Sequence, residues 1–318
     1  MRKTLLLFVL VGAFLAYGNA QSVRHATHVV PNGKGWGVET PTGISPAEAT
    51  PNPAVVTGNG INYHGGPVMP GTVNIYFIWY GNWTNGPHAS DSQTTVSLMD
   101  TLYDSGGMGG SGYALINSTY GDSTHNVSGN FGLAGSTTNN YSQGRRLSDN
   151  GVRTVVSNAI SSHALPKDTN GVYFVLTSSD VNETSGFCTQ YCGWHTRSTI
   201  SGSDIKYAFV GNPDRCSSAC EAQTSSPNGD SGADGMASIM AHETEEAISD
   251  PDLNAWYDSS GEENADKCAW KFGPTTGTIG NRAYNQTFGG HNWLIQMNWE
   301  NARKGGCDKT KGGTFYTR

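Results

Sequence analysis

The stretch from Val73 to Tyr80 reads VNIYFIWY, a run of β-branched and aromatic residues with few polar breaks. Such a run predicts a strand that is buried in a sheet. Two further strands are predicted, VYFVLTS at 172–178 and KYAFVG at 206–211. Apolar residues recur with helical spacing at 91–103 and in a segment that begins at Asp149, the expected N-cap. This order predicts one α+β domain over residues 61–318, with a mixed sheet, packed helices and long Gly-rich loops.

Composition excludes several classes of protein. Of the 318 residues, 42 are Gly and only 14% are charged, against about 25% in average proteins. The net charge is −7. These values argue against a charge-rich disordered chain, a coiled coil and a basic protein that binds nucleic acid.

The N-terminus predicts export. Arg2 and Lys3 precede the apolar run LLLFVLVGAFLAY, and the small residues Gly18 and Ala20 follow it, so residues 1–20 are expected to be a signal peptide. The run is shorter than the roughly 20 residues that span a bilayer, and no later segment approaches that length. We therefore expect a secreted, extracellular protein without a membrane span. Residues 21–60 mix Pro, Gly, Thr and Ser, as in a flexible arm or a pro-segment.

The cysteines lie only in the C-terminal half of the chain. In an exported protein, six Cys predict three disulfides that brace loops. We expect two local bridges and one long one, although a zinc site made of four Cys is an alternative. The cysteines are Cys188, Cys192, Cys216, Cys220, Cys268 and Cys307.

One predicted helix concentrates ionisable residues. Its sequence, DGMASIMAHETEEAISDP, begins at Asp234 as a candidate N-cap and ends before Pro251. At about 100° per residue, Glu243 falls inside the apolar arc, and His242 and Glu246 lie on its flank. Asp250 joins this side, whereas Glu245 is expected to point away. A buried carboxylate is costly unless it is paired, protonated or bound to a metal.

This helix is expected to be zincin-like. In the zinc-binding motif H-E-x-x-H, two ligands four residues apart face one ion, and the Glu acts on a water in the open position. Here Glu246 replaces the second His of that motif, so His242 and Glu246 are the predicted zinc ligands and Glu243 the predicted general base.

A third ligand is expected from the segment GEENADKC, where Glu263 and Asp266 are alternatives. His195 is another candidate ligand, although a structural role is the favoured interpretation for it. Asp250 is expected to orient the ligands through hydrogen bonds. Calcium is an alternative ion if the ligands are mostly oxygens.

Several strings together resemble the phosphate-induced protein family, also called the Exordium-like family. The match spans about residues 60–310 and includes YHGGPV (63–68), NIYFIWYGNW (74–83), FCTQYCGWH (187–195), YAFVGNPDRC (207–216), the His-Glu helix, NAWYD (254–258) and ADKC (265–268). This resemblance implies an extracellular or cell-wall protein; plant members are linked to growth and cell expansion.

Three hypotheses of function follow. The first is a zinc-dependent peptidase that cleaves an extracellular peptide or protein. The second is a non-catalytic module that binds cell-wall polysaccharide or a receptor and regulates growth. The third is a glycoside hydrolase that uses paired carboxylates such as Glu243 and Asp266.

Overall fold

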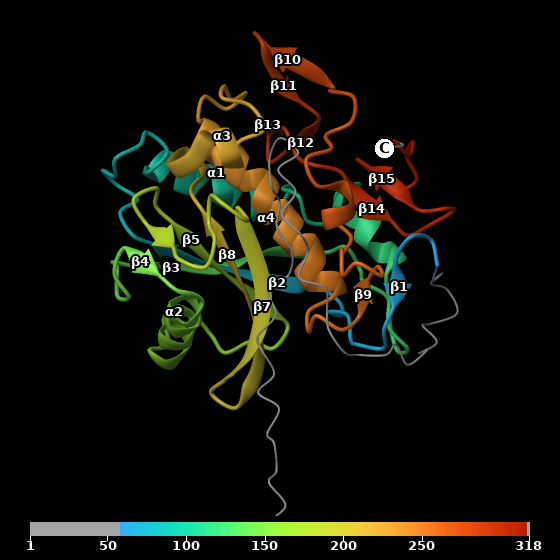
Figure 1. The fold of residues 1–318 in the computed structure, drawn as a ribbon, viewed down its shortest axis with the longest axis horizontal. Coiled ribbons are helices and arrows are strands. Elements are labelled where there is room, and N and C mark those ends of the chain that lie inside the picture. The colour runs from blue at the N-terminus through green and yellow to red at the C-terminus, as the bar shows by residue number, and fades with distance from the viewer. Residues whose placement is uncertain (1–57, 317–318) are drawn as a thin grey trace, which may run out of the picture.

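The computed structural model describes residues 58–316, so the predicted signal peptide and almost all of the predicted arm lie outside the described residues. The centre of the fold is a five-stranded sheet with the order β3-β2-β5-β8-β7 (Figure 1). Its strands are β2 (Val73–Tyr80), β3 (Phe131–Asn139), β5 (Gly171–Thr177), β7 (Gly193–Ile200) and β8 (Ser203–Gly211). Four strands run parallel, and β7 pairs antiparallel with β8 at one edge. The predicted mixed sheet with packed helices is confirmed.

The central strands are apolar because both of their faces are covered. Every residue of β5 is buried, and all of β2 is buried except Asn74. A parallel strand between two covered faces needs a continuous apolar run rather than an alternating one. For this reason the three strands predicted from such runs are present, with shifts of a few residues at their ends.

Two helices connect the first three parallel strands. Helix α1 (Gln93–Tyr103) lies between β2 and β3 in the chain, and α2 (Asp149–Ser161) lies between β3 and β5. The predicted N-cap of α2 is one residue off, because the Ser148 side chain accepts the hydrogen bond from the backbone N–H of Gly151 and Asp149 lies in the first turn. A serine hydroxyl at this position serves the same purpose as a carboxylate.

Two strands of the sheet are not among the three expected from the sequence. Strand β3 lies inside the Gly-, Ser- and Asn-rich region at 105–145, and β7 follows the first cysteine pair. The β7–β8 hairpin turns at Ser201 and Gly202, which both have positive φ values, 50° and 77°. Two positive φ values match the twist of a tight hairpin. This turn brings β7 to the edge of the sheet, next to the helix that carries the predicted site.

Short elements surround the sheet. They are β1 (Asn62–Tyr63), η1 (Ala114–Thr119), β4 (Arg146–Leu147), β6 (Asn182–Glu183), η2 (Pro213–Cys216), α3 (Ser217–Cys220), β9 (Trp256–Tyr257), η3 (Asp266–Cys268), β10 (Gly277–Ile279), β11 (Arg282–Tyr284), β12 (Gln286–Phe288), β13 (His291–Trp293), β14 (Asn298–Glu300) and β15 (Gly306–Asp308). Figure 1 places the long helix α4 (Ser231–Ser249) between the sheet and several of the C-terminal hairpins.

Three disulfides are formed, and of the expected bridges only the long one is confirmed. Cys268 bonds to Cys307, as expected. The two local bridges are wrong: the actual pairs are Cys188–Cys216 and Cys192–Cys220. The two short Cys-x3-Cys segments are thus joined to each other rather than closed on themselves. Each of these bridges ties the approach to β7 to the segment that precedes α4.

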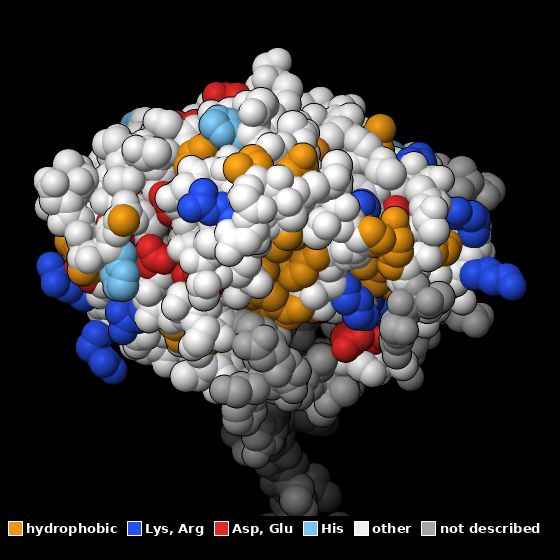
Figure 2. Space-filling view, turned by 90° about the horizontal axis from the view of Figure 1, so that it is seen from above, with side chains coloured by type: hydrophobic (Ala, Val, Ile, Leu, Met, Phe, Trp, Pro, Cys, Tyr) orange, Lys and Arg blue, Asp and Glu red, His pale blue; other side chains and the backbone are white. Residues whose placement is uncertain are grey.

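The surface is poor in charge. Figure 2 shows a face made mostly of neutral polar side chains and backbone, with Lys, Arg, Asp and Glu scattered across it. Within residues 58–316, no helix is both long and apolar enough to cross a bilayer.

Glu221, directly after α3, makes stability depend on pH. Burial raises the pKa of Glu221 to about 8, and the carboxylate of Asp214 adds to the shift. An unfolded Glu titrates near about pH 4.3. Between these values the folded chain binds more protons than the unfolded chain, so the contribution of Glu221 to stability falls as pH rises through this window.

We therefore expect Glu221→Gln to be more stable than the wild type above about pH 8, by at least about 1 kcal/mol. Near pH 4, where the folded and unfolded forms of Glu221 are both largely neutral, the difference should be small. Urea unfolding at a series of pH values measures this difference. Glu262→Gln, at a half-buried site, is the control, and parallel pH profiles for the wild type and Glu221→Gln would contradict the prediction.

Candidate functional site

Helix α4 begins earlier than the sequence predicts. It starts at Ser231, and its N-cap is Asp230, whose carboxylate accepts a hydrogen bond from the backbone N–H of Ala233 at 2.9 Å. Asp234, the predicted cap, lies in the first turn and accepts hydrogen bonds from the side chains of Ser226 and Asn228. The C-terminal prediction holds, because α4 ends at Ser249, two residues before Pro251.

The outer face of α4 is also covered. Every residue from Gly232 to Ser249 is buried, because β7 and β8 pack on one side and η1 and β13 contact the helix as well. The prediction that Glu245 points away from the apolar surroundings is therefore wrong. Its carboxylate is fully buried and accepts a hydrogen bond from Asn298 Nδ2 at 3.0 Å. Burial raises the pKa of Glu245 well above its ordinary value.

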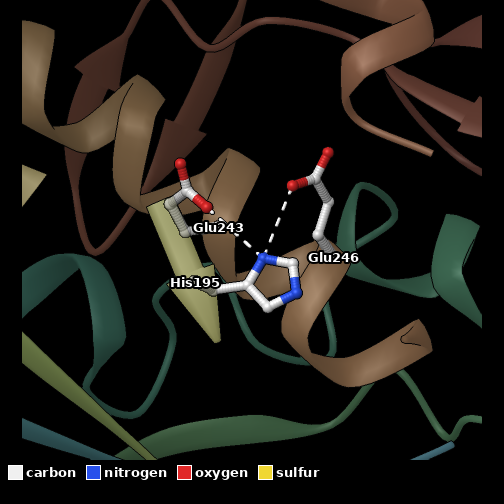
Figure 3. Close-up of side chains that lie close together, drawn as sticks. All are labelled: His195, Glu243 and Glu246. Atoms are coloured by element: carbon white, nitrogen blue, oxygen red, sulfur yellow. Dashed lines mark ion pairs between the residues drawn. The ribbon is translucent and has the colours of Figure 1, made fainter. Parts of the chain in front are cut away.

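His195 enters the site from strand β7. It pairs with Ala208 of β8, and its imidazole points between two carboxylates of α4 (Figure 3). His195 Nδ1 lies 3.5 Å from Glu243 Oε2 and 3.5 Å from Glu246 Oε2. All three side chains have zero solvent exposure. Strand β7 thus places an imidazole nitrogen, a candidate metal ligand, opposite the carboxylates of Glu243 and Glu246.

A second group of candidate metal ligands also includes Glu246. His242 Nε2 lies 3.0 Å from Glu246 Oε1 and 3.4 Å from Asp266 Oδ1. Asp266 comes from η3, and its backbone N–H donates to Glu246 Oε1 at 3.1 Å. The loop is held close by the Cys268–Cys307 disulfide. Of the two alternative third ligands, Asp266 is the one that the structure places against His242 and Glu246.

Glu263 and Asp250 border the cluster. Glu263 Oε1 lies 3.8 Å from His195 Nε2, on the far side of the ring from Glu243. Asp250 Oδ1 accepts the backbone N–H groups of Asn254 and Ala255 at 2.7 and 2.6 Å. Asp250 therefore holds the chain reversal after α4, and its expected role in orienting the metal ligands stays a prediction.

Burial and mutual charge shift the pKa values of Glu243 and Glu246 in opposite directions. Burial raises the pKa of Glu243 to about 7 despite its contact with His195. Burial would also raise the pKa of Glu246, but His242 and His195 outweigh it and lower the pKa to about 2. Of the two, Glu246 is therefore the one whose charged form is favoured.

The two histidines are shifted upward. Burial disfavours the charged ring of His195, but Glu243 and Glu246 raise its pKa to about 9. Burial acts in the same sense on His242, and the charge of Glu246 and the contact with Asp266 raise its pKa well above the ordinary value. Protons thus balance the buried charge when no cation is bound.

The donor atoms fit a metal ion. Both nitrogens of His195, both oxygens of Glu243 and Glu246 Oε2 are buried and make no hydrogen bond within the described residues. Buried polar atoms normally have a partner. Ligands about 2.0–2.1 Å from a tetrahedral zinc ion lie about 3.3 Å apart. The four histidine-to-carboxylate distances in the two groups are 3.0–3.5 Å, and all candidate ligand atoms of each group lie within 4.8 Å of one another.

The side-chain amide of Gln296 contacts the Nδ1 atom of His242. Gln296 Nε2 lies 2.9 Å from His242 Nδ1 and also donates to the carbonyl of Ala265. If Nε2 binds a metal, the ring proton resides on Nδ1, and the Gln296 amide must turn its oxygen toward the ring. Gln296 was not expected from the sequence, because it lies 54 residues from His242 in an irregular segment.

Comparison with known families identifies the family of this chain. A family model described as "Phosphate-induced protein 1 conserved region" matches residues 61–305, which include β2, β7, α4 and the loop that carries Asp266. The chain belongs to the phosphate-induced protein 1 family. The resemblance proposed from the ordered motifs is therefore confirmed.

Named relatives of this phosphate-induced protein 1 family member are plant proteins. Protein EXORDIUM-like 5 of Arabidopsis thaliana is 33% identical over 75% of this chain and 75% of its own length. Protein EXORDIUM-like 3 of the same plant is 32% identical over 62% of this chain and 64% of its own. Protein PHOSPHATE-INDUCED 1 of Nicotiana tabacum is 25% identical over 62% and 67%. No solved structure matches the chain.

In this family member, the structure brings together residues from three separate segments. His242, Glu243 and Glu246 come from α4, Asp266 from η3, and His195 from β7. The helix spacing and the acidic loop could be recognised in the sequence. The approach of β7 could not, because nothing local in GWHTRSTI indicates which strand or helix lies beside it.

Proposed function

We propose that this chain is an extracellular member of the family that regulates growth as a non-catalytic module, and that its buried centre binds a divalent metal ion. The three disulfides support an oxidising location outside the cytosol. The predicted signal peptide and the role implied by the family resemblance support the same assignment. Zinc is the proposed ion, because two imidazole nitrogens with carboxylates suit zinc better than calcium.

One observation carries this proposal. His195, His242, Glu243 and Glu246 all have zero exposure, yet several of their polar atoms make no hydrogen bond. Closed centres are typical of structural metal sites, whereas a peptidase site needs a position open to a polypeptide. The metal ion would link α4 to β7 and to the loop at Asp266, and so hold the C-terminal half on the sheet.

Elemental analysis of the mature protein, purified without chelator, tests the metal centre. We expect at least about one zinc per chain, as ligation by protein side chains in a closed site implies. Protein that carries no stoichiometric divalent metal would overturn the proposal. The control is the same preparation after unfolding in chelator, which should be free of zinc.

A zinc-dependent peptidase is the second candidate, and the state of Glu243 favours it. Both oxygens of Glu243 are without a hydrogen bond, and burial raises its pKa to about 7. A carboxylate with a pKa near neutrality can accept a proton from an attacking water. In this candidate, motion of the surrounding segments would have to admit the substrate.

Glu243→Gln distinguishes the two candidates. If the chain is a peptidase, hydrolysis of a denatured protein substrate should fall by at least about 100-fold, the usual contribution of a general base. If it is a non-catalytic module, neither protein should hydrolyse the substrate, and binding to cell-wall polysaccharide on a glycan array should be equal for wild type and variant. Glu262→Gln is the control for both assays.

A further inference from the structure

We propose that the centre holds two divalent metal ions bridged by the carboxylate of Glu246. This inference rests on the proposed metal centre and extends it. One ion would be bound by His242 Nε2, Glu246 Oε1 and Asp266 Oδ1. The other would be bound by His195 Nδ1, Glu243 Oε2 and Glu246 Oε2.

The donor atoms form two sets of three. In each set, all donor atoms lie within 4.8 Å of one another, and Glu246 is the residue that the two sets share. Its two oxygens face different histidines: Oε1 is 3.0 Å from His242 Nε2, and Oε2 is 3.5 Å from His195 Nδ1. One imidazole beside each oxygen of a carboxylate is an arrangement that suits a bridged pair of ions.

The contact between His242 and Glu246 does not have the geometry of a hydrogen bond. His242 Nε2 lies at hydrogen-bonding distance from Glu246 Oε1, but it makes no hydrogen bond within the described residues. His195 Nδ1 and both oxygens of Glu243 are also without one. Buried polar atoms that lie close together without bonding to one another call for another partner, and an ion supplies one.

Formal charge favours two ions over one. Five acidic side chains lie in the cluster or directly beside it: Glu243, Glu246, Asp250, Glu263 and Asp266. If all five were ionised and both histidines neutral, one divalent ion would leave a formal charge of about −3 in a buried space and two would leave about −1. A second ion therefore replaces protons that would otherwise have to neutralise costly buried charge. Within residues 58–316, the cationic side chains that pair with Glu243, Glu246 and Glu263 are only the two histidines.

Groups behind the two rings suit ligation. Glu263 Oε1 lies 3.8 Å from His195 Nε2, so the nitrogen that does not bind metal faces a carboxylate. The Gln296 amide lies 2.9 Å from the corresponding nitrogen of His242 and would accept a hydrogen bond from it once the amide oxygen is turned toward the ring. Histidine ligands commonly have such a partner, which orients the ring. In this assignment Glu243 is a ligand and not a general base.

The test is the metal content of the full-length secreted protein and its variants after saturation with zinc and gel filtration. We expect about two zinc ions per chain in the wild type, about one in His195→Ala and about one in Asp266→Asn, since each variant loses a ligand of one set. His88→Ala, which replaces an exposed histidine, is the control and should retain two.

Cobalt(II) titration of the wild type supplies a second measurement that needs no variant. Two equivalents should bind, and the second should change the electron paramagnetic resonance of the first through the shared carboxylate. One bound ion in the wild type would overturn the bridged pair and leave the proposed metal centre intact. No bound ion would overturn both proposals.

Discussion

Glu246→Gln is expected to abolish metal binding and to destabilise the fold by about 3–5 kcal/mol, the usual cost of removing one partner from a buried ion pair. Glu246 contacts His242 and His195, and it accepts the backbone N–H of Asp266. The amide has nearly the same shape, but it lacks the negative charge that both histidines require. The loss is therefore electrostatic rather than steric.

Urea unfolding and zinc analysis of the same preparations measure this effect. Glu262→Gln is the matched control, because it makes the same chemical change at a half-buried position one residue from Glu263. The control should retain its zinc and the unfolding midpoint of the wild type. A Glu246→Gln protein with unchanged metal content and stability would show that the charge of Glu246 neither binds a metal nor stabilises the fold.

Removal of the metal is the second change with a large expected effect. A ligand that binds only the folded state stabilises it by about 4 kcal/mol at 1,000 times its Kd. For a domain of this size, that corresponds to a fall in Tm of about 10 °C when the ion is removed. The structural reason is that His195, Glu246 and Asp266 lie on three separate segments, and the ion would link all three through their side chains.

Scanning calorimetry before chelation, after chelation and after restoration of zinc measures the shift. The disulfides must remain intact, because their reduction would destabilise the chain independently. Magnesium serves as the control, since it prefers octahedral oxygen ligands and should not restore the Tm. An equal Tm in all samples would contradict a stabilising metal centre.

The features that local pattern determines were predicted well. The continuous apolar run of β2 reflects burial on both faces, and Pro251 limits the helix that carries His242, Glu243 and Glu246. The spacing of these three residues places them on neighbouring turns, whatever packs against the helix. Local rules of this kind depend on only a few adjacent residues, so the sequence by itself determined them.

The tertiary structure decided what meets that helix. A tight turn after β7 places His195 at the sheet edge, next to Glu243 and Glu246. Two disulfides join the segment before β7 to the segment before α4. The same long-range packing buries Glu245, which the helical pattern alone placed on an exposed face. Pairing between distant strands and between distant cysteines depends on the packing free energy of the whole fold. No single segment of the sequence therefore specifies it.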